Sequence, residues 1–92
     1  MVEHAAGIRL DKWLWQARFF KSRSLAASAV SSGARVNGAR VTKPSALVRP
    51  GDELTFKQNR RIRYVKVLAC GERRGPAAEA ALLYEDKTPP VE

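Results

Sequence analysis

The spacing of apolar residues near the start of the chain predicts a short amphipathic helix. The positions of one apolar stripe, spaced i, i+3, i+4 and i+7, are Leu10, Trp13, Leu14 and Ala17. A stripe of this kind covers one side of a helix and packs against a core. We therefore expect a helix that begins near Arg9 or Leu10 and buries this side.

The side of this helix opposite the apolar stripe combines aromatic and basic side chains. A helical wheel at about 100° per residue places Lys12, Trp15 and Phe19 there. Arg9 and Arg18 flank the stripe. Aromatic rings among bases suit a surface that meets phosphates and flat nucleobases together. The alternative is that Trp15 and Phe19 belong to the core or dock another helix.

A second helix and a hairpin follow a polar break. Ser22 is a good N-cap, and Gly33 is placed to end the helix. The apolar positions between them are Leu25, Ala26, Ala29 and Val30. The pair Asn37-Gly38 is typical of a type I′ turn, because both residues tolerate positive φ. We expect an angled or antiparallel helix pair that leads into a tight hairpin over residues 35–41.

The rest of the chain predicts more strands and one further helix. Strands are expected around residues 54–56 and 62–68, joined near 58–60. The second strand has apolar residues on both faces, which indicates either a bulge or a sheet partly covered on both faces. Pro76 before an alanine-rich run predicts a helix over 77–84 that docks Leu82 and Leu83.

Three arginines near the second expected hairpin have two interpretations. Arg60, Arg61 and Arg63 either extend a binding surface or protect a strand edge from aggregation.

Charge points to an anionic partner. The 92 residues contain 17 Lys and Arg against nine Asp and Glu, which gives a formal charge of +8 and a pI near 10.4. Nucleic acid is the first candidate and an acidic membrane surface the second. Residues 76–92 hold one base and four acids, so the positive charge belongs to the first three quarters of the chain.

The length fits one compact domain. We expect a flexible leader at 1–7, an RNA-binding domain at 8–70, a linker and short packed helix at 71–86, and a flexible tail at 87–92. The start has no basic and apolar leader of the signal-peptide type, and no apolar run reaches the length of a membrane span. The single cysteine fits a reducing compartment, so we expect a cytoplasmic protein.

The residues do not form a recognisable catalytic constellation. His4 is the only histidine and Cys70 the only cysteine, so neither a nucleophile–base pair nor a zinc site is predicted. The glycines do not have the spacing of a phosphate-binding loop. Asp11 is expected to cap the first helix or pair with a nearby arginine. We therefore expect a binding protein with no enzyme activity, cofactor, metal or small-molecule substrate.

Five blocks of sequence together resemble a known family. They are Arg9-Leu10-Asp11-Lys12-x-Leu14, Lys21-Ser22-Arg23-x-x-Ala26, Gly33-x-x-Val36-Asn37-Gly38, Lys43-Pro44-Ser45 and Pro50-Gly51-Asp52. In this order, over residues 8–56, they resemble the RNA-binding module first named for ribosomal protein S-four. The resemblance implies an α+β fold: two helices packed on a small, strongly bent antiparallel sheet. It also implies that RNA lies on the face shared by the helices and the first hairpin.

A closer likeness extends to the end of the chain. The segments at 13–19 and 76–85 resemble the bacterial ribosome-associated heat-shock proteins of fifteen kilodaltons. That resemblance implies recognition of large ribosomal subunits obstructed by peptidyl-tRNA, and help in their rescue or recycling. It implies large-subunit rRNA and peptidyl-tRNA as partners, without a membrane, and we expect a monomer. That family usually continues with a long basic helical tail beyond Glu92, so either the contacts of such a tail are missing or the sequence is a piece of a longer chain.

Two other functions remain open at this stage. The short length and the segment at 50–54 also resemble the S-four-domain factor of bacterial ribosome quality control. That factor holds peptidyl-tRNA in the P-site region while a partner adds a C-terminal tail to the nascent chain. A generic protein that binds structured RNA or DNA is the second possibility.

The expected RNA contacts come from the first 43 residues. They are Arg9, Lys12, Trp15, Arg18, Lys21, Ser22, Arg23, Arg35, Asn37, Arg40 and Lys43. Trp15 is a candidate for stacking on a base. If the basic side chains make about six phosphate contacts, log K should fall against log salt with a slope of about −4 to −5.

Overall fold

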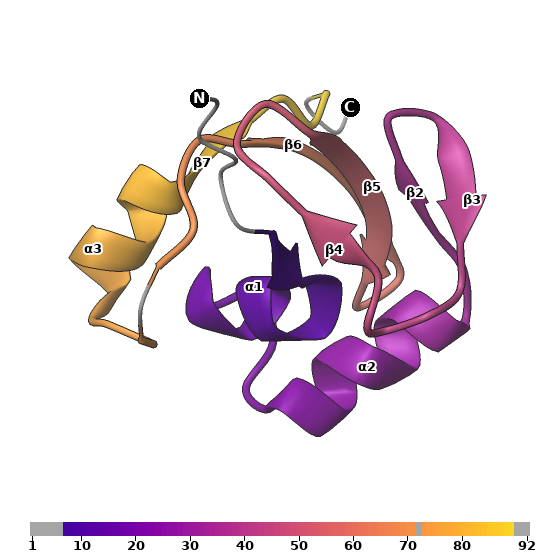
Figure 1. Cartoon of the computed structure of the whole chain (residues 1–92), viewed down its shortest axis with the longest axis horizontal. Coiled ribbons are helices and arrows are strands. Elements are labelled where there is room, and N and C mark those ends of the chain that lie inside the picture. The colour runs from indigo at the N-terminus through magenta and orange to yellow at the C-terminus, as the bar shows by residue number, and fades with distance from the viewer. Residues whose placement is uncertain (1–6, 72, 90–92) are drawn as a thin grey trace, which may run out of the picture.

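The computed structural model describes residues 7–71 and 73–89 of the chain (Figure 1). Its elements in order are β1 (Ile8–Arg9), α1 (Leu10–Gln16), α2 (Arg23–Ser31), β2 (Ala34–Val36), β3 (Ala39–Val41), β4 (Leu47–Val48), β5 (Glu53–Gln58), β6 (Arg61–Val67), α3 (Ala77–Ala80), η1 (Ala81–Leu83) and β7 (Tyr84–Asp86). Residues 1–6 of the expected leader and residues 90–92 of the expected tail lie outside the described residues.

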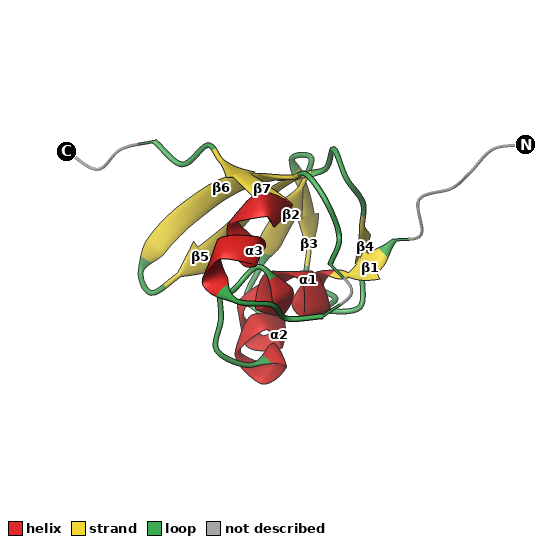
Figure 2. Ribbon diagram, turned by 90° about the vertical axis from the view of Figure 1, so that its left-hand side faces the viewer, coloured by secondary structure: helices red, strands yellow, loops and turns green. Residues whose placement is uncertain are grey.

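The strands form two antiparallel sheets. Five of them pair in the order β3-β2-β5-β6-β7, and the short strands β1 and β4 pair separately. Figure 2 shows α1 and α2 packed beneath the curved five-stranded sheet. This arrangement is the predicted α+β class, with two helices on a small bent antiparallel sheet.

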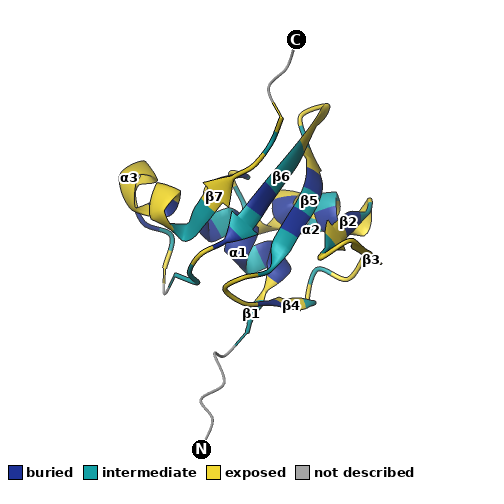
Figure 3. Ribbon diagram, turned by 90° about the horizontal axis from the view of Figure 1, so that it is seen from above, coloured by how far each residue is buried: buried dark blue, intermediate teal, exposed yellow. Residues whose placement is uncertain are grey.

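The core lies between α1, α2 and the sheet. The predicted stripe of α1 is confirmed, because its four side chains are at most 3% exposed. Val65 and Val67 of β6 are fully buried from the other side, and Figure 3 shows buried segments in α1, β5 and β6. Trp13 also donates from Nε1 to the carbonyl of Ala69 at 2.9 Å, which ties α1 to the chain after β6.

The predicted position of Phe19 on the solvent face is wrong. Helix α1 ends at Gln16, and Arg18 takes a left-handed backbone with φ of 66°. The helical wheel therefore does not apply at residue 19, and the Phe19 side chain points into the core, where it is 7% exposed. Its ring lies 5.0 Å from that of Phe56 and 4.6 Å from that of Tyr84, measured between centroids.

The pairing of β5 with β6 explains why the second strand has apolar residues on both of its faces. Their register is continuous from Glu53 opposite Lys66 to Gln58 opposite Arg61, so no bulge intervenes. Ile62 lies on the outer face and is 58% exposed. Arg63, by contrast, packs inward over the Phe19 ring and bridges to Asp86 at 2.9 Å.

The last described segment differs from the helix predicted over 77–84. Helix α3 covers only Ala77–Ala80, a 3₁₀ turn follows, and Tyr84 begins the strand β7. The predicted docking of Leu82 is wrong, because its side chain is 73% exposed. Leu83 and Tyr84 pack against the core as the chain joins the edge of the sheet.

Candidate nucleic-acid interface

One buried carboxylate brings together two of the predicted arginines. Arg9 donates from Nε and Nη2 to the two oxygens of Asp11 at 3.1 and 3.0 Å. Arg23, at the start of α2, lies 3.5 Å from the same carboxylate. The Asp11 side chain is 6% exposed, whereas those of Arg9 and Arg23 are 49% and 43% exposed. We call these three residues the Asp11 cluster. It carries a formal charge of +1 and presents two oriented guanidinium groups to solvent.

The local sequence explains how Arg23 reaches this position. Ser22 accepts a hydrogen bond from the backbone N–H of Leu25 at 3.1 Å, so it is the predicted N-cap of α2. Arg23 is the first residue of the helix, and the first turn contains no acidic residue. The positive end of the helix dipole thus adds to the positive charge of the cluster.

Lys43 lies in a loop held against the first turn of α1. The backbone N–H of Leu10 donates to Ala46 at 2.8 Å, and that of Asp11 donates to Pro44 at 3.2 Å. Lys43 is exposed in this loop, and Lys12 is half-buried in the same helical turn. Lys21 is exposed immediately before the Ser22 cap. These three lysines therefore lie on the segments that surround the Asp11 cluster.

The predicted Asn37-Gly38 turn is present, and its asparagine is tied to the sheet. The φ angles are 53° and 86°, as a type I′ turn requires. Asn37 donates from Nδ2 to Asp52 at 3.1 Å and accepts from the backbone N–H of Glu53 at 2.9 Å. The side chain of Asn37 thus fixes the hairpin on β5, although the residue itself is exposed.

Arg35 and Arg40 form a second basic group at the opposite end of α2. They are cross-strand partners in the β2–β3 hairpin and both are exposed. The nine residues of α2 separate this group from Arg23 by about 13 Å along the helix axis. Apart from Arg18, the predicted bases therefore lie in separate groups at the two ends of one helix.

Trp15 and Arg18 lie in a third group, held by the segment that follows β6. Arg18 donates to the carbonyl of Gly75 at 2.8 Å. Arg74 donates to the carbonyl of Trp15 at 3.0 Å, and its guanidinium lies 5.8 Å from the centre of the Trp15 ring. Trp15 is half-buried, so the arginine already occupies part of the surface expected to stack on a base.

Two residues of these groups, Arg74 and Lys57, were not predicted from the sequence pattern. Arg74 donates to the carbonyl of Trp15 from 59 residues away, a contact that no local pattern encodes. Lys57 joins Arg35 and Arg40 around a pocket, which becomes visible only when β5 is placed beside β2. A period-two strand pattern marks Lys57 as outward-facing but does not show its neighbours.

The thiol of Cys70 is not an activated nucleophile. It is partly buried, and burial raises its pKa, with a further contribution from the charge of Asp52. Within residues 7–71 and 73–89, no three His, Cys, Asp or Glu side chains gather as metal ligands. In the same part of the chain, no helix combines the length and apolar character needed to cross a bilayer.

Comparison with known proteins identifies the family. The S4 domain matches residues 8–54. The chain is 48% identical over 89 residues to heat shock protein 15 of Escherichia coli (strain K12), covering 96% of this chain and 66% of that protein. It is 39% identical to the heat shock protein 15 homolog of Haemophilus influenzae, covering 86% of this chain and 60% of that homolog. This chain thus spans slightly less than two thirds of the length of these relatives.

A solved structure gives the same result in three dimensions. The trimeric structure of Vibrio cholerae heat shock protein 15 superimposes with a TM-score of 0.80 at 38% identity, covering 89% of this chain and 83% of that one. The match includes the segment after residue 54, which the S4 domain does not cover. The chain therefore belongs to the S4 domain family and, within it, to the heat shock protein 15 group.

Proposed function

We propose that this protein binds structured RNA of the large ribosomal subunit through the surface around the Asp11 cluster. In this proposal it recognises large subunits obstructed by peptidyl-tRNA and aids their rescue or recycling. The observation that carries the RNA contact is the pair of half-exposed guanidinium groups held on one buried carboxylate. Membership of the S4 domain and heat shock protein 15 groups supports RNA of the ribosome as the partner.

The geometry of the Asp11 cluster favours phosphate recognition. Each arginine keeps N–H groups that the carboxylate does not use, because a guanidinium has five donors. Arginine forks match the two oxygens of a phosphate, and ordering by Asp11 removes part of the entropy cost of binding. Lys12, Lys21 and Lys43 supply further charge on the surrounding segments, and release of counterions from the RNA then drives binding.

Sedimentation with three kinds of particle tests the proposal. Wild-type protein is mixed with large subunits that carry peptidyl-tRNA, with vacant large subunits and with small subunits, at low and at high salt. We expect co-sedimentation with the obstructed large subunits, and a loss as salt rises. Protein that stays at the top of the gradient with obstructed subunits at low salt would contradict the proposal.

A variant pair links this binding to the Asp11 cluster. Arg23→Ala removes one exposed guanidinium, and Arg61→Ala removes the same charge from the start of β6, outside the Asp11 cluster. We expect Arg23→Ala to weaken co-sedimentation more than Arg61→Ala. Equal losses would show that net charge alone drives the binding, and equal competition by duplex DNA at matched salt would favour a generic nucleic-acid-binding protein.

The same particles separate rescue from the quality-control alternative. A rescue factor increases the release or turnover of obstructed large subunits in a translation mixture. A factor of the tailing pathway instead holds peptidyl-tRNA on the subunit and lengthens the nascent chain when its partner enzyme is added.

A further inference from the structure

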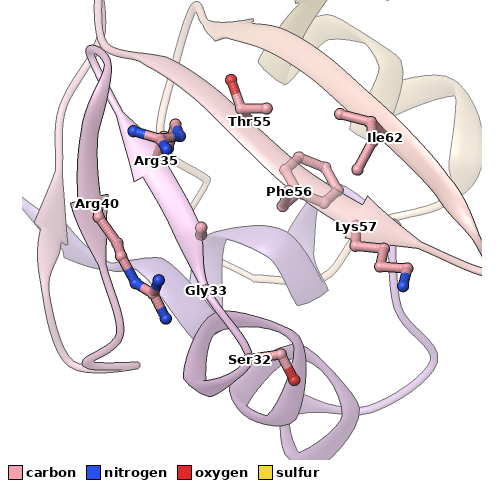
Figure 4. Close-up of a pocket in the computed structure, with 9 residues that line it drawn as sticks. Ser32, Gly33, Arg35, Arg40, Thr55, Phe56, Lys57 and Ile62 are labelled. Atoms are coloured by element: carbon pink, nitrogen blue, oxygen red, sulfur yellow. The ribbon is translucent and has the colours of Figure 1, made fainter.

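A pocket of about 260 Å³ lies where the end of α2 meets the two hairpins of the sheet. Ser32 and Gly33 form its base, Arg35 and Arg40 come from β2 and β3, and β5 and β6 contribute Lys57 and Ile62. Figure 4 shows the two arginines on one side and Lys57 with Ile62 on the other. The pocket therefore combines three cations with one exposed apolar side chain.

The charges of this pocket are not balanced by acids. Among the described residues, none that line it is an Asp or Glu, and Arg35, Arg40 and Lys57 take part in none of the ion pairs. Arg35 uses one N–H on the carbonyl of Gly38 at 3.0 Å, which orients its guanidinium and leaves its other donors available. Three cations in one concave site attract an anion strongly.

Arg40 has a second role at the end of α2. Its Nη2 lies 3.5 Å from where a Cβ of Gly33 would be. The last carbonyls of a helix carry partial negative charge, and a cation placed beside Gly33 counters that charge. The pocket thus stays electropositive although it adjoins the C-terminal end of a helix, and a phosphate would sit between Arg35 and Lys57.

The size and the wall opposite the arginines indicate a nucleotide. A volume of about 260 Å³ lies just below the range of about 300–1,000 Å³ typical of pockets for drug-sized ligands. It suits one residue of a longer chain. Ile62 is 58% exposed on this wall and offers apolar surface to a ribose or base. An acidic peptide would use the cations but gain little from Ile62.

We propose that this pocket is a second RNA subsite, which holds the phosphate of one unpaired nucleotide between Arg35 and Lys57 and its ribose or base against Ile62. The inference rests on the proposed RNA-binding function and extends the contact surface across α2. It adds Lys57 and Ile62, on strands β5 and β6, to the residues that contact RNA. It also makes the strand of RNA follow α2 from the Asp11 cluster to the hairpin.

The first test compares salt dependence for a 20-nucleotide single-stranded RNA of mixed sequence. Lys57→Ala is paired with Lys66→Ala, which removes the same charge from β6 outside the pocket. Loss of one phosphate contact should reduce the steepness of log K against log salt by about 0.7. The ratio of wild-type to variant affinity should therefore be about fivefold larger at 0.1 M salt than at 1 M salt. Lys66→Ala should change the slope much less. Equal slopes for the two variants would overturn the subsite.

A second variant separates the phosphate from the rest of the nucleotide. Ile62→Thr keeps a β-branched side chain and the charge, and removes apolar surface. We expect about a threefold loss of affinity with an unchanged salt slope, as for a small apolar contact. An affinity equal to that of the wild type would overturn the ribose or base contact.

Titration with uridine monophosphate measures directly whether a single nucleotide binds in the pocket. In NMR spectra of ¹⁵N-labelled protein, we expect shifts at the amides of Gly33, Lys57 and Ile62 that Lys57→Ala abolishes. Equal shifts on adding a polyglutamate peptide would overturn the RNA assignment in favour of an acidic protein. Failure of wild-type protein to bind large subunits would refute the proposed function, whereas normal binding by Lys57→Ala would refute this subsite alone.

Discussion

The two ends of α2 present positive charge in different ways. At the N-terminal end, Arg9 and Arg23 are ordered by the buried Asp11, which cancels one of their two charges. At the C-terminal end, Arg35, Arg40 and Lys57 surround a pocket whose described lining residues include no acid. The Asp11 cluster itself is preorganised and carries a net charge of +1, whereas the three cations of the pocket carry +3 and are less constrained. The comparison shows that the number of cationic side chains and the ordering of those side chains are two separate properties of a binding surface.

The largest expected difference between the two ends is in stability. Arg9→Ala with Arg23→Ala leaves the buried Asp11 without a cation, and we expect a loss of about 3 kcal/mol in the free energy of unfolding. Arg35→Ala with Arg40→Ala removes the same charge from exposed positions, and should cost no more than about 0.5 kcal/mol. Urea unfolding of both double variants measures this. Adding Asp11→Asn to the first variant should restore stability without restoring RNA binding.

A smaller effect is expected from the backbone at the pocket end. Gly33 has a φ of 120°, a backbone conformation that residues with a Cβ rarely adopt, so Gly33→Ala introduces strain there. We expect a loss of about 1–2 kcal/mol, measured by thermal unfolding. Ser31→Ala is the matched control, since Ser31 is an exposed residue within the regular part of α2. Equal melting temperatures for the two variants would contradict the strained geometry.

Exchange of arginine for lysine sharpens the same contrast. Arg9 contacts both oxygens of Asp11, a geometry that a lysine cannot reproduce, so Arg9→Lys should cost about 1 kcal/mol. Arg40→Lys keeps the charge at the pocket end and should leave stability within about 0.5 kcal/mol. Chemical denaturation of the two variants checks the difference. A larger loss of stability for Arg40→Lys than for Arg9→Lys would contradict the view that the arginines of the Asp11 cluster are the more constrained ones.

The smallest effect is a response to acid at Glu53, the first residue of the central strand β5. Tyr64 and then Lys87 donate to Glu53, and these bonds hold the pKa of Glu53 below its usual value. Since the folded-state pKa is lowered, this contribution is present above the usual value and is lost as pH falls through the lowered one. Unfolding measured from pH 7 to pH 3 should show less pH dependence for Glu53→Gln than for the wild type. An unchanged pH profile would contradict the role of Glu53.

Local chemistry was sufficient to predict much of the fold. The stripe of α1, the Ser22 cap, the end of α2 at Gly33 and the Asn37-Gly38 turn depend on neighbouring residues, so a sequence pattern determines them. The pairing of Asp11 with an arginine was likewise one of the two expected roles for that residue. The α+β class followed from these pieces and from the resemblance to the S4 domain.

Contacts between distant residues were beyond the sequence pattern. The helical wheel fails at Phe19, because the left-handed Arg18 turns the chain after α1. The strand β7 is not apparent from its short sequence, since Tyr84 gains its place by pairing with Val67. The hairpin pocket needs β5 beside β2, and Arg74 reaches α1 across the fold. Each of these depends on topology more than on local propensity.

The bond from Arg74 to Trp15 bears on where the domain can be divided. The segment that matches the S4 domain stops at residue 54, yet the aromatic rings of α1 and its following turn are covered by β6 and by Tyr84. An excised piece that ended at residue 54 would expose Trp13 and Phe19 to water. We therefore expect the segment after residue 54 to be needed for residues 8–54 to fold stably.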